Sequence, residues 1–434
     1  MGKLGVKLVV RGYLEDLFRT AIAAAHPAHC LPPHLPHPPK GRLIVLAAGK
    51  AAGSMTEVTE RHYLDGLKLP PARMTGIAVA RHGYGRPTRV VDMVEAGHPL
   101  PDAAGLAAAA RALEFADDAD EGDLVLVLIS GGASANWFAP ANGISVADKQ
   151  AVTRAMLRSG ATIGEINTVR KHISRIKGGR LARHAHPAQV VTCAISDVPG
   201  DEPAVIGSGP TVPDPSTLAD ARAIIARLGI EVPGSVRRAL ADPANETPKP
   251  GDAVIAGDKV TVIARPADAL HAAEAKVRAA GYECVTFPDQ LEGEARTVAA
   301  EHARLARELR AQGKRAVILS GGELTVTIRG KGKGGPNQEY TLALALALDG
   351  VEAVTALAAD TDGTDGGGGR PDDPAGAYFD GKTMARARAL GLDPAEFLAD
   401  NDSTGFFART GGLVRTGPTF TNVNDFRAIL VDRR

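Results

Sequence analysis

The chain has 434 residues, too many for one hydrophobic core at about 100–200 residues per domain, so its length predicts two domains or more. Fifty lysines and arginines balance 50 aspartates and glutamates, which leaves no net charge to attract nucleic acid or an anionic membrane. The three cysteines form neither a CxxC pair nor the even framework of a secreted domain, and no segment reaches the ~18 apolar residues of a membrane span. We therefore expect a cytoplasmic protein with reduced thiols and no nucleic-acid or membrane partner.

Five short apolar segments recur along the chain, each followed by an alanine-rich segment of helical period. Counted together with the turn residues that end them, they span residues 42–50, 123–132, 189–197, 315–323 and 353–360. Continuous apolar strands that alternate with helices predict an α/β fold with a parallel sheet covered on both faces. In such sheets ligands bind beyond the carboxyl ends of the strands, so the turns after these segments are the places to look for chemistry.

A polar, proline-containing stretch, residues 241–252, separates two series of strands and helices. Such a stretch has little to bury and is typical of a connection between domains. We place the boundary there and expect one domain over residues 1–245 and a second over residues 250–434.

The turns after the first two apolar segments offer groups that could bind an anion. Lys50 follows the first segment, beside backbone N–H groups at the end of the expected strand. The turn after the second contains small residues that let backbone amides approach a phosphate or carboxylate closely: Ser130, Gly131, Gly132 and Ser134. The alternative in each case is structural, an ordinary surface lysine or the glycines of a tight turn.

Residues 167–180 concentrate positive charge and contain no acidic residue, although the chain as a whole is neutral. A solvated helix face usually mixes signs, so this segment indicates local binding of a polyanion. Its candidate ligands, with those of a second flexible loop, are Asn167, Arg170, Lys171, Lys177, Gly178, Gly179, Arg180, Gly207, Ser208 and Gly209. Asp197, just past the third apolar segment, could serve as a base toward a hydroxyl or as a Mg²⁺ ligand.

The second half contains one acidic loop and one misleading pattern. Asp360, Asp362 and Asp365 follow an apolar segment, which favours either a Mg²⁺ site or a solvated acidic loop. Residues 376–383 satisfy the formula of a P-loop, but no strand precedes them and two bulky aromatic residues would crowd a phosphate. No G-x-G-x-x-G opens a helix after a strand, which argues against a nicotinamide-dependent dehydrogenase.

Seven blocks appear in an order that resembles the bacterial and archaeal glycerate 2-kinase family. They are LISGGASA, NTVRKHISRIKGGRLA, ISDVPGDEPAVIGSGPTVPDPST, LEGEAR, LSGGELTVTIRGKGKGGPNQE, DTDGTDG and TGPTFTNVNDF. The resemblance implies a Rossmann-like N-terminal domain, a smaller MOFRL-type C-terminal domain and an active site in the cleft between them. It also implies transfer of the γ-phosphoryl group of ATP, with Mg²⁺, to D-glycerate, which gives 2-phosphoglycerate. Because some members are labelled hydroxypyruvate reductase, that NAD(P)H-dependent activity is the first alternative, and a non-catalytic module that binds a small anion is the second.

Carried over to this sequence, the resemblance makes Lys50 the lysine that steadies the transferred phosphoryl group and Asp197 the acceptor of the hydroxyl proton. The small-residue loops and the basic segment would hold the carboxylate and the phosphates, together with Gly321, Gly322, Glu323, Asn337 and Gln338. Asp360 and Asp362 would be metal or nucleotide contacts. Pro336 stands where many members have arginine, so Arg329, Lys331 or Lys333 would have to supply that cation. The alanine-rich helices are compatible with a homodimer.

Overall fold

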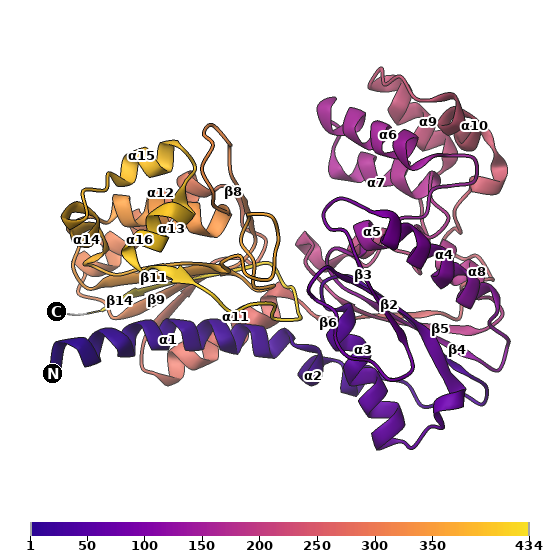
Figure 1. The fold of residues 1–434 in the computed structure, drawn as a ribbon, viewed down its shortest axis with the longest axis horizontal. Helices are drawn as coiled ribbons and strands as arrows, with labels where there is room; N and C mark the ends of the chain where they lie inside the picture. Colours follow the sequence, from indigo (N-terminus) through magenta and orange to yellow (C-terminus); the bar gives the residue numbers. More distant parts are fainter. Residues whose placement is uncertain (1, 433–434) are drawn as a thin grey trace. The chain divides into compact units, whose positions relative to one another are not determined.

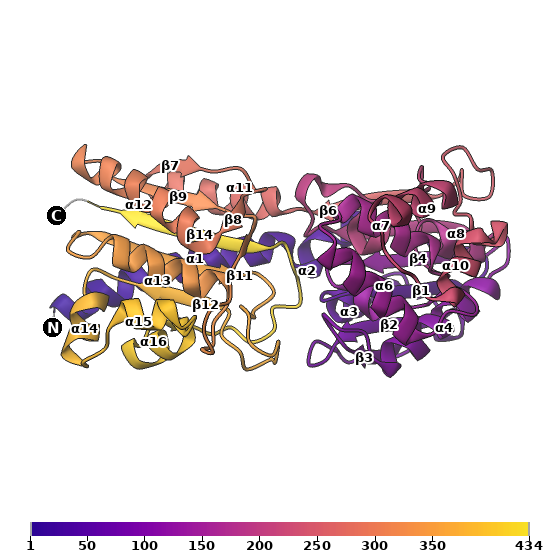
Figure 2. The ribbon, with the colours of Figure 1, turned by 90° about the horizontal axis from the view of Figure 1, so that it is seen from above.

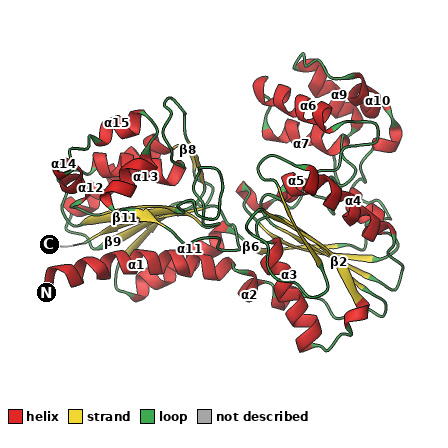
Figure 3. Cartoon of the chain, viewed as in Figure 1, coloured by secondary structure: helices red, strands yellow, loops and turns green. Residues whose placement is uncertain are grey.

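The computed structural model describes residues 2–432, which form two compact units. One runs from Cys30 to Ile263 and is called the parallel-sheet unit. The other joins the N-terminal segment up to His29 to the chain from Ala264 onward and is called the mixed-sheet unit. Each contains one six-stranded sheet with helices on its faces (Figures 1 and 3). The α/β fold class predicted from the sequence is confirmed.

The parallel-sheet unit has the strand order β3-β2-β1-β4-β5-β6, which is the order of a Rossmann fold. The strands are β1 (Leu43–Ala48), β2 (Met74–Arg81), β3 (Asp92–Ala96), β4 (Leu124–Ile129), β5 (Gln189–Ile195) and β6 (Lys259–Ala264). β1 and β4 are buried along their whole length, as expected for strands covered on both faces. β1 pairs in parallel with both β2 and β4, so it lies at the centre of the sheet.

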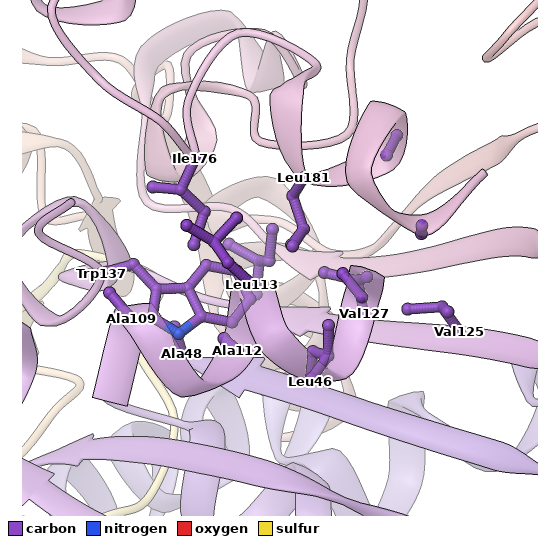
Figure 4. Packing of buried hydrophobic residues seen from close by; sticks show 14 of the residues in the cluster. Leu46, Ala48, Ala109, Ala112, Leu113, Val125, Val127, Trp137, Ile176 and Leu181 are labelled. Atoms are coloured by element: carbon purple, nitrogen blue, oxygen red, sulfur yellow. The ribbon is translucent and has the colours of Figure 1, made fainter. Parts of the chain in front are cut away.

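Two groups of helices accompany this sheet. One surrounds the sheet and consists of α3 (Ala52–Glu60), α4 (Ala103–Asp117), α5 (Ala133–Asn136) and α8 (Arg180–Ala185). Figure 4 shows the core beneath it, where the Trp137 ring packs among side chains of the sheet and of α4. The second group has a hydrophobic core of its own and consists of α6 (Val146–Arg158), α7 (Ile163–His172), α9 (Leu218–Arg227) and α10 (Gly234–Ala241). Thr162 and Thr217 begin α7 and α9 with capping boxes, which satisfy backbone N–H groups of the first turn.

The mixed-sheet unit has the strand order β13-β12-β11-β14-β9-β7. The strands are β7 (Glu283–Thr286), β9 (Ala316–Ser320), β11 (Val354–Asp360), β12 (Gly376–Phe379), β13 (Leu413–Val414) and β14 (Asp425–Val431), with a separate parallel pair of β8 (Glu292–Glu294) and β10 (Glu323–Thr325). On one face lie α1 (Gly2–Ala25) and α11 (Pro266–Ala279), and on the other α12 (Ala295–Ala311), α13 (Pro336–Ala347), α14 (Thr383–Ala389), α15 (Pro394–Ala399) and α16 (Ser403–Thr410) (Figures 1 and 2). Within residues 2–432, no helix combines the length and the apolar character needed to cross a membrane.

Two expectations from the sequence were wrong. The last two apolar segments, β9 and β11, belong to a mostly antiparallel sheet, in which β14 pairs antiparallel with both. The expected division at residues 245–250 also differs from the observed one, because it assigns β6 and α1 to the wrong units. β6 lies after it and completes the first sheet, and α1 lies far before it but packs on the second. Strand pairing and helix docking of this kind join segments that local composition cannot connect.

Candidate functional site

The carboxyl ends of β1, β4 and β5 lie side by side in the parallel-sheet unit. Ala48 is in register with Ile129, and Ile129 is in register with Ala194. Counting two residues onward from each places Lys50, Gly131 and Ser196 at the same level, with Asp197 next in the chain. The sequence therefore predicted correctly that these segments end at a common edge, which we call the strand-end shelf.

The turn that carries Lys50 packs tightly on the turn after β4. The Lys50 backbone N–H donates to the Gly131 carbonyl oxygen at 2.8 Å, and the Ala51 N–H donates to Ser130 Oγ at 2.9 Å. Gly49 has φ 117°, and a Cβ at this position would lie 2.4 Å from Ser130 Oγ. Only glycine allows this approach. It fixes the backbone of Lys50, whose side chain is half-buried, against the loop of small residues.

Gly132, with φ 87°, leaves space between two side chains of the shelf. A Cβ on it would lie 2.9 Å from His98 Cδ2 and 3.5 Å from Lys50 Cγ. The imidazole of His98 and the stem of Lys50 therefore flank this glycine. His98 was not identified from the sequence, because nothing near it in the chain marks it as a neighbour of Lys50.

Lys177 joins the loop after β4 to the loop at residues 207–209. Its ammonium donates to Ser134 O at 3.1 Å, to Ser134 Oγ at 3.0 Å and to Gly207 O at 3.4 Å. The Ser134 and Ser208 hydroxyls lie 2.7 Å apart. Lys177 is only 1% exposed, and burial, with the charges of Arg170 and Lys149, holds its pKa well below the ordinary value. Three of the predicted segments are thus brought together around one buried cation.

Other residues of the basic segment are engaged within the fold. Lys171 pairs with Asp214, its ammonium 3.4 Å from the carboxylate. The N–H groups of Gly178 and Gly179 donate to the carbonyls of Ser208 and Gly209 at 3.0 and 2.8 Å. Arg180 donates to the Asn245 carbonyl, and Asn167 is buried in α7. These contacts give the segment a structural role that the sequence interpretation, which assigned it to anion binding, did not include.

Asp197 follows β5 and is half-buried at the shelf. The chain then turns through Gly200 and Asp201, which have φ values of 80° and 55°. The neighbouring Ser196 hydroxyl lies against Val198, accepting from its N–H at 3.3 Å. The turn after β5 therefore has a defined backbone that holds a carboxylate on the same edge as Lys50.

In the mixed-sheet unit, Asn337 and Gln338 are buried at the start of α13. Asp365 accepts hydrogen bonds from the backbone N–H groups of Asn337 and Gln338 at 3.0 and 2.8 Å, and from both side-chain amides. Burial, reinforced by the charge of Asp425, raises the pKa of Asp365 to about 7. Burial also raises the pKa of Asp425, although Arg427, 3.0 Å away, opposes this shift. The two amides, which the sequence assigned to ligand binding, hold the loop after β11 onto α13.

Gly321 and Gly322 connect β9 to β10, and Glu323 is the first residue of β10. Gly322 has φ 81°, and a Cβ on it would lie 2.1 Å from the Leu291 carbonyl oxygen. Arg427 donates to the carbonyls of Gly321 and Gly322 at 2.7 and 3.4 Å, while Glu323 is exposed. The buried side chain of Arg427 therefore holds the turn between β9 and β10 in place.

The predicted metal residues Asp360 and Asp362 form consecutive turns after β11. Asp360 Oδ1 accepts from the Asp362 N–H at 2.8 Å, and Asp362 Oδ1 accepts from the Thr364 N–H at 2.7 Å. Their carboxylates are the hard oxygen donors that Mg²⁺ prefers. Across the part of the chain that the structure describes, no cluster of three or more His, Cys, Asp or Glu residues has the arrangement of a metal site. A Mg²⁺ ion held here would take further ligands from water or substrate.

The buried cation Lys149 was not identified from the sequence. Lys149 lies in α6 on the same face as Val152 and Met156, three and seven residues further on, and all three are buried. A lysine in register with the apolar face of a helix was the signal that could have identified it.

Comparison with known proteins identifies the family. A model described as a domain of unknown function, DUF4147, matches residues 13–241, and the MOFRL family model matches residues 316–425. An Agrobacterium vitis protein named "Putative hydroxypyruvate reductase" is 45% identical over 97% of this chain and 94% of its own length. The D-glycerate 2-kinase of Thermotoga maritima is 38% identical over 94% of this chain and 95% of its own. The chain belongs to the glycerate 2-kinase family.

A solved structure agrees with this assignment. A crystal structure of glycerate kinase from Thermotoga maritima aligns with a TM-score of 0.86 and 36% identity, covering 98% of this chain and 99% of that one. As a member of the glycerate 2-kinase family, the chain is an enzyme. The MOFRL match runs from β9 to the first residue of β14, within the mixed-sheet unit.

Proposed function

We propose that this enzyme transfers the γ-phosphoryl group of ATP to D-glycerate, forming 2-phosphoglycerate and ADP. The observation that carries the proposal is the strand-end shelf, where a lysine follows β1 and a carboxylate follows β5, the two strands on either side of β4 in a Rossmann-like sheet. Phosphoryl transfer depends mainly on positioning and on cations that stabilise charge at the phosphoryl oxygens. Family membership supports the same reaction, since relatives that match nearly the whole chain are named glycerate 2-kinase.

In this proposal Asp197 acts on the hydroxyl group of glycerate, and Lys50 acts on the phosphoryl group that is transferred. The glycerate 2-hydroxyl oxygen forms a bond to the γ-phosphorus while the bond from that phosphorus to the bridging oxygen of ADP breaks. Asp197 accepts the hydroxyl proton, and the Lys50 ammonium stabilises the negative charge on the transferred group. The close packing of Gly49 on Ser130 restricts the backbone from which Lys50 extends, which favours a fixed position for its charge.

The remaining predicted ligands divide into a substrate group and a metal group. Ser134 lies within hydrogen-bond distance of both Ser208 and Lys177, and these three residues, with Ser130 of the same loop, would bind the acid or the phosphates. Asp360 and Asp362 would hold Mg²⁺, which neutralises charge between the β- and γ-phosphates when it is bound. Their consecutive turns direct two carboxylates from one short loop, a donor set that fits this ion.

A reductase is the alternative that a specific observation favours, because a relative 45% identical to this chain carries that name. A third possibility is a module that binds the same anions without turnover. The discriminating experiment incubates purified protein with D-glycerate, ATP and Mg²⁺, follows ADP release and identifies the phosphoglycerate isomer by NMR. A parallel reaction supplies hydroxypyruvate with NADH or NADPH. Formation of 2-phosphoglycerate supports the proposal, oxidation of the nicotinamide without ADP release replaces it with the reductase, and binding without either reaction leaves the non-catalytic module.

A further inference from the structure

A pocket of about 390 Å³ lies inside the parallel-sheet unit, between α6, α7 and the turn at residues 99–101. Its volume is at the low end of the ~300–1,000 Å³ range of ligand sites. Four cationic side chains line it, those of Lys149, Arg154, Arg170 and Lys177, and no aspartate or glutamate is among its described lining residues. A concave site with this charge is suited to a small anion.

Lys149 is the decisive group in this pocket. Its side chain is 1% exposed, and its ammonium has no hydrogen-bond partner among the described residues. The ammonium lies 5.0 Å from the centre of the Phe138 ring, a contact that only partly replaces hydration. A buried charge without a partner is costly, so native proteins pair or neutralise it. Within the described residues, the chain supplies no anion to pair with the Lys149 ammonium.

The groups facing Lys149 from the surrounding elements are also cations. Arg170 extends from α7 and Arg180 from α8, and the pKa of Lys149 lies well below its ordinary value because of burial and these two charges. Burial and the charges of Arg170 and Lys149 act on Lys177 in the same direction. An oxyanion in the pocket would raise the pKa values of both Lys149 and Lys177 back toward their ordinary value.

We propose that the Lys149 pocket binds a small oxyanion, through charge-assisted hydrogen bonds from Lys149 and Arg170 and through the nearby positive charge of Lys177. Carboxylates and phosphates share this chemistry. Lys177 reaches from the pocket to Ser134 and Gly207, and Ser134 lies two residues from Gly132, the glycine beside Lys50. The pocket thus adjoins the strand-end shelf. Resting on the proposed function, this adjacency makes the carboxylate of the hydroxy-acid substrate the first source of the oxyanion, and free phosphate is the second.

The test replaces Lys149 by methionine, which has similar length and no charge, and by arginine, which restores the charge. Lys40→Met, at an exposed position of the same unit, is the matched control. Calorimetry with the full-length protein measures Kd for D-glycerate, for inorganic phosphate and for glycerol, which lacks the carboxylate. We expect Lys149→Met to weaken binding of an oxyanion about tenfold or more, and Lys149→Arg to recover part of that affinity. The Kd for glycerol should be the same in both variants as in the wild-type protein. Melting temperature reports on folding, and it should not fall in Lys149→Met because an unpaired buried charge is removed.

Each outcome has a distinct meaning. Weaker binding of D-glycerate, with a matching rise in KM, identifies the substrate carboxylate as the source. Weaker binding of phosphate alone identifies a separate phosphate site, and this result would stand even if the wild-type protein proved unable to phosphorylate glycerate. Unchanged Kd values for both anions, as in Lys40→Met, overturn the proposal while leaving the kinase assignment intact if turnover is normal. Failure of the wild-type protein to bind either anion overturns it as well.

Discussion

Lys50 is the residue on which the proposed chemistry depends most directly. We expect Lys50→Ala to lower kcat at least ~100-fold, the usual effect of removing one preorganised charge from a transition state. The fold should be unaffected, because the backbone contacts of this turn come from Gly49, the Lys50 N–H and Ala51 rather than from the ammonium. Steady-state kinetics with D-glycerate and ATP, together with circular dichroism, check both expectations. Near-normal turnover in this variant would exclude Lys50 from the mechanism.

Single residues of the site were predictable from the sequence where a strand end marks them. Lys50 and Asp197 each follow a continuous apolar segment, and parallel strands bring such positions to one edge. Lys149 was not predicted, because the cations that surround it, Arg170 and Arg180, come near only when α7 and α8 pack in the fold. The structural engagement of Lys171, Gly178 and Gly179 was missed for the same reason. A list of cations in sequence does not say which of them meet an acidic partner.

At the scale of elements, the packing of α12 on α13 contains a titratable contact. His302 of α12 is buried, and its Nδ1 lies 2.7 Å from the Tyr340 hydroxyl of α13. Burial, with the charge of Arg427, lowers the pKa of His302 to about 4 from an ordinary 6.5. Between these values the unfolded chain binds the proton more tightly, so acid favours unfolding. Stability should therefore be lost as pH falls from 6.5 toward 4, by up to ~1.4 kcal/mol per pH unit from this group.

The measurement is urea unfolding of the full-length protein at several values of pH between 4.5 and 7, the window set by the two pKa values. His302→Gln cannot titrate but retains a polar group near Tyr340, so its stability should fall less steeply on acidification. His271→Gln, at an exposed position of α11, should retain the wild-type dependence. Equal slopes in all three proteins would mean that His302 contributes nothing to acid sensitivity.

The sequence predicted the strands β1, β4, β5, β9 and β11, but it did not predict the direction in which those of the second sheet run. β9 and β11 have the same continuous apolar pattern as β1 and β4, because each is buried on both faces. That pattern records burial and carries no information about the direction of a neighbouring strand. β14, the antiparallel partner of both, follows a turn-rich segment near the end of the chain and was not among the predicted strands.

At the scale of the whole molecule, the first helix belongs with the last part of the chain. α1 packs on α11 and on the mixed sheet through the buried residues Leu14, Leu17 and Phe18. Arg11 donates to the carbonyls of Gly411 and Leu413, both at 3.0 Å. Each large apolar side chain contributes about 1.5–3 kcal/mol when buried, so three of them approach the ~5–15 kcal/mol that stabilises a typical domain. The mixed-sheet unit should therefore require α1.

Dividing the chain tests this dependence. We expect a polypeptide of residues 30–265 to unfold cooperatively by itself, since it retains the whole parallel sheet including β6. Residues 264–434 alone should expose the face that α1 covers and should melt without a cooperative transition. Joining residues 1–29 to residue 264 through a flexible linker should restore that transition, whereas the same fusion with Leu17→Lys should not, because a lysine there would bury a charge in an apolar contact. Differential scanning calorimetry of the four polypeptides distinguishes these cases. Cooperative folding of residues 264–434 without the helix would restrict α1 to a peripheral role.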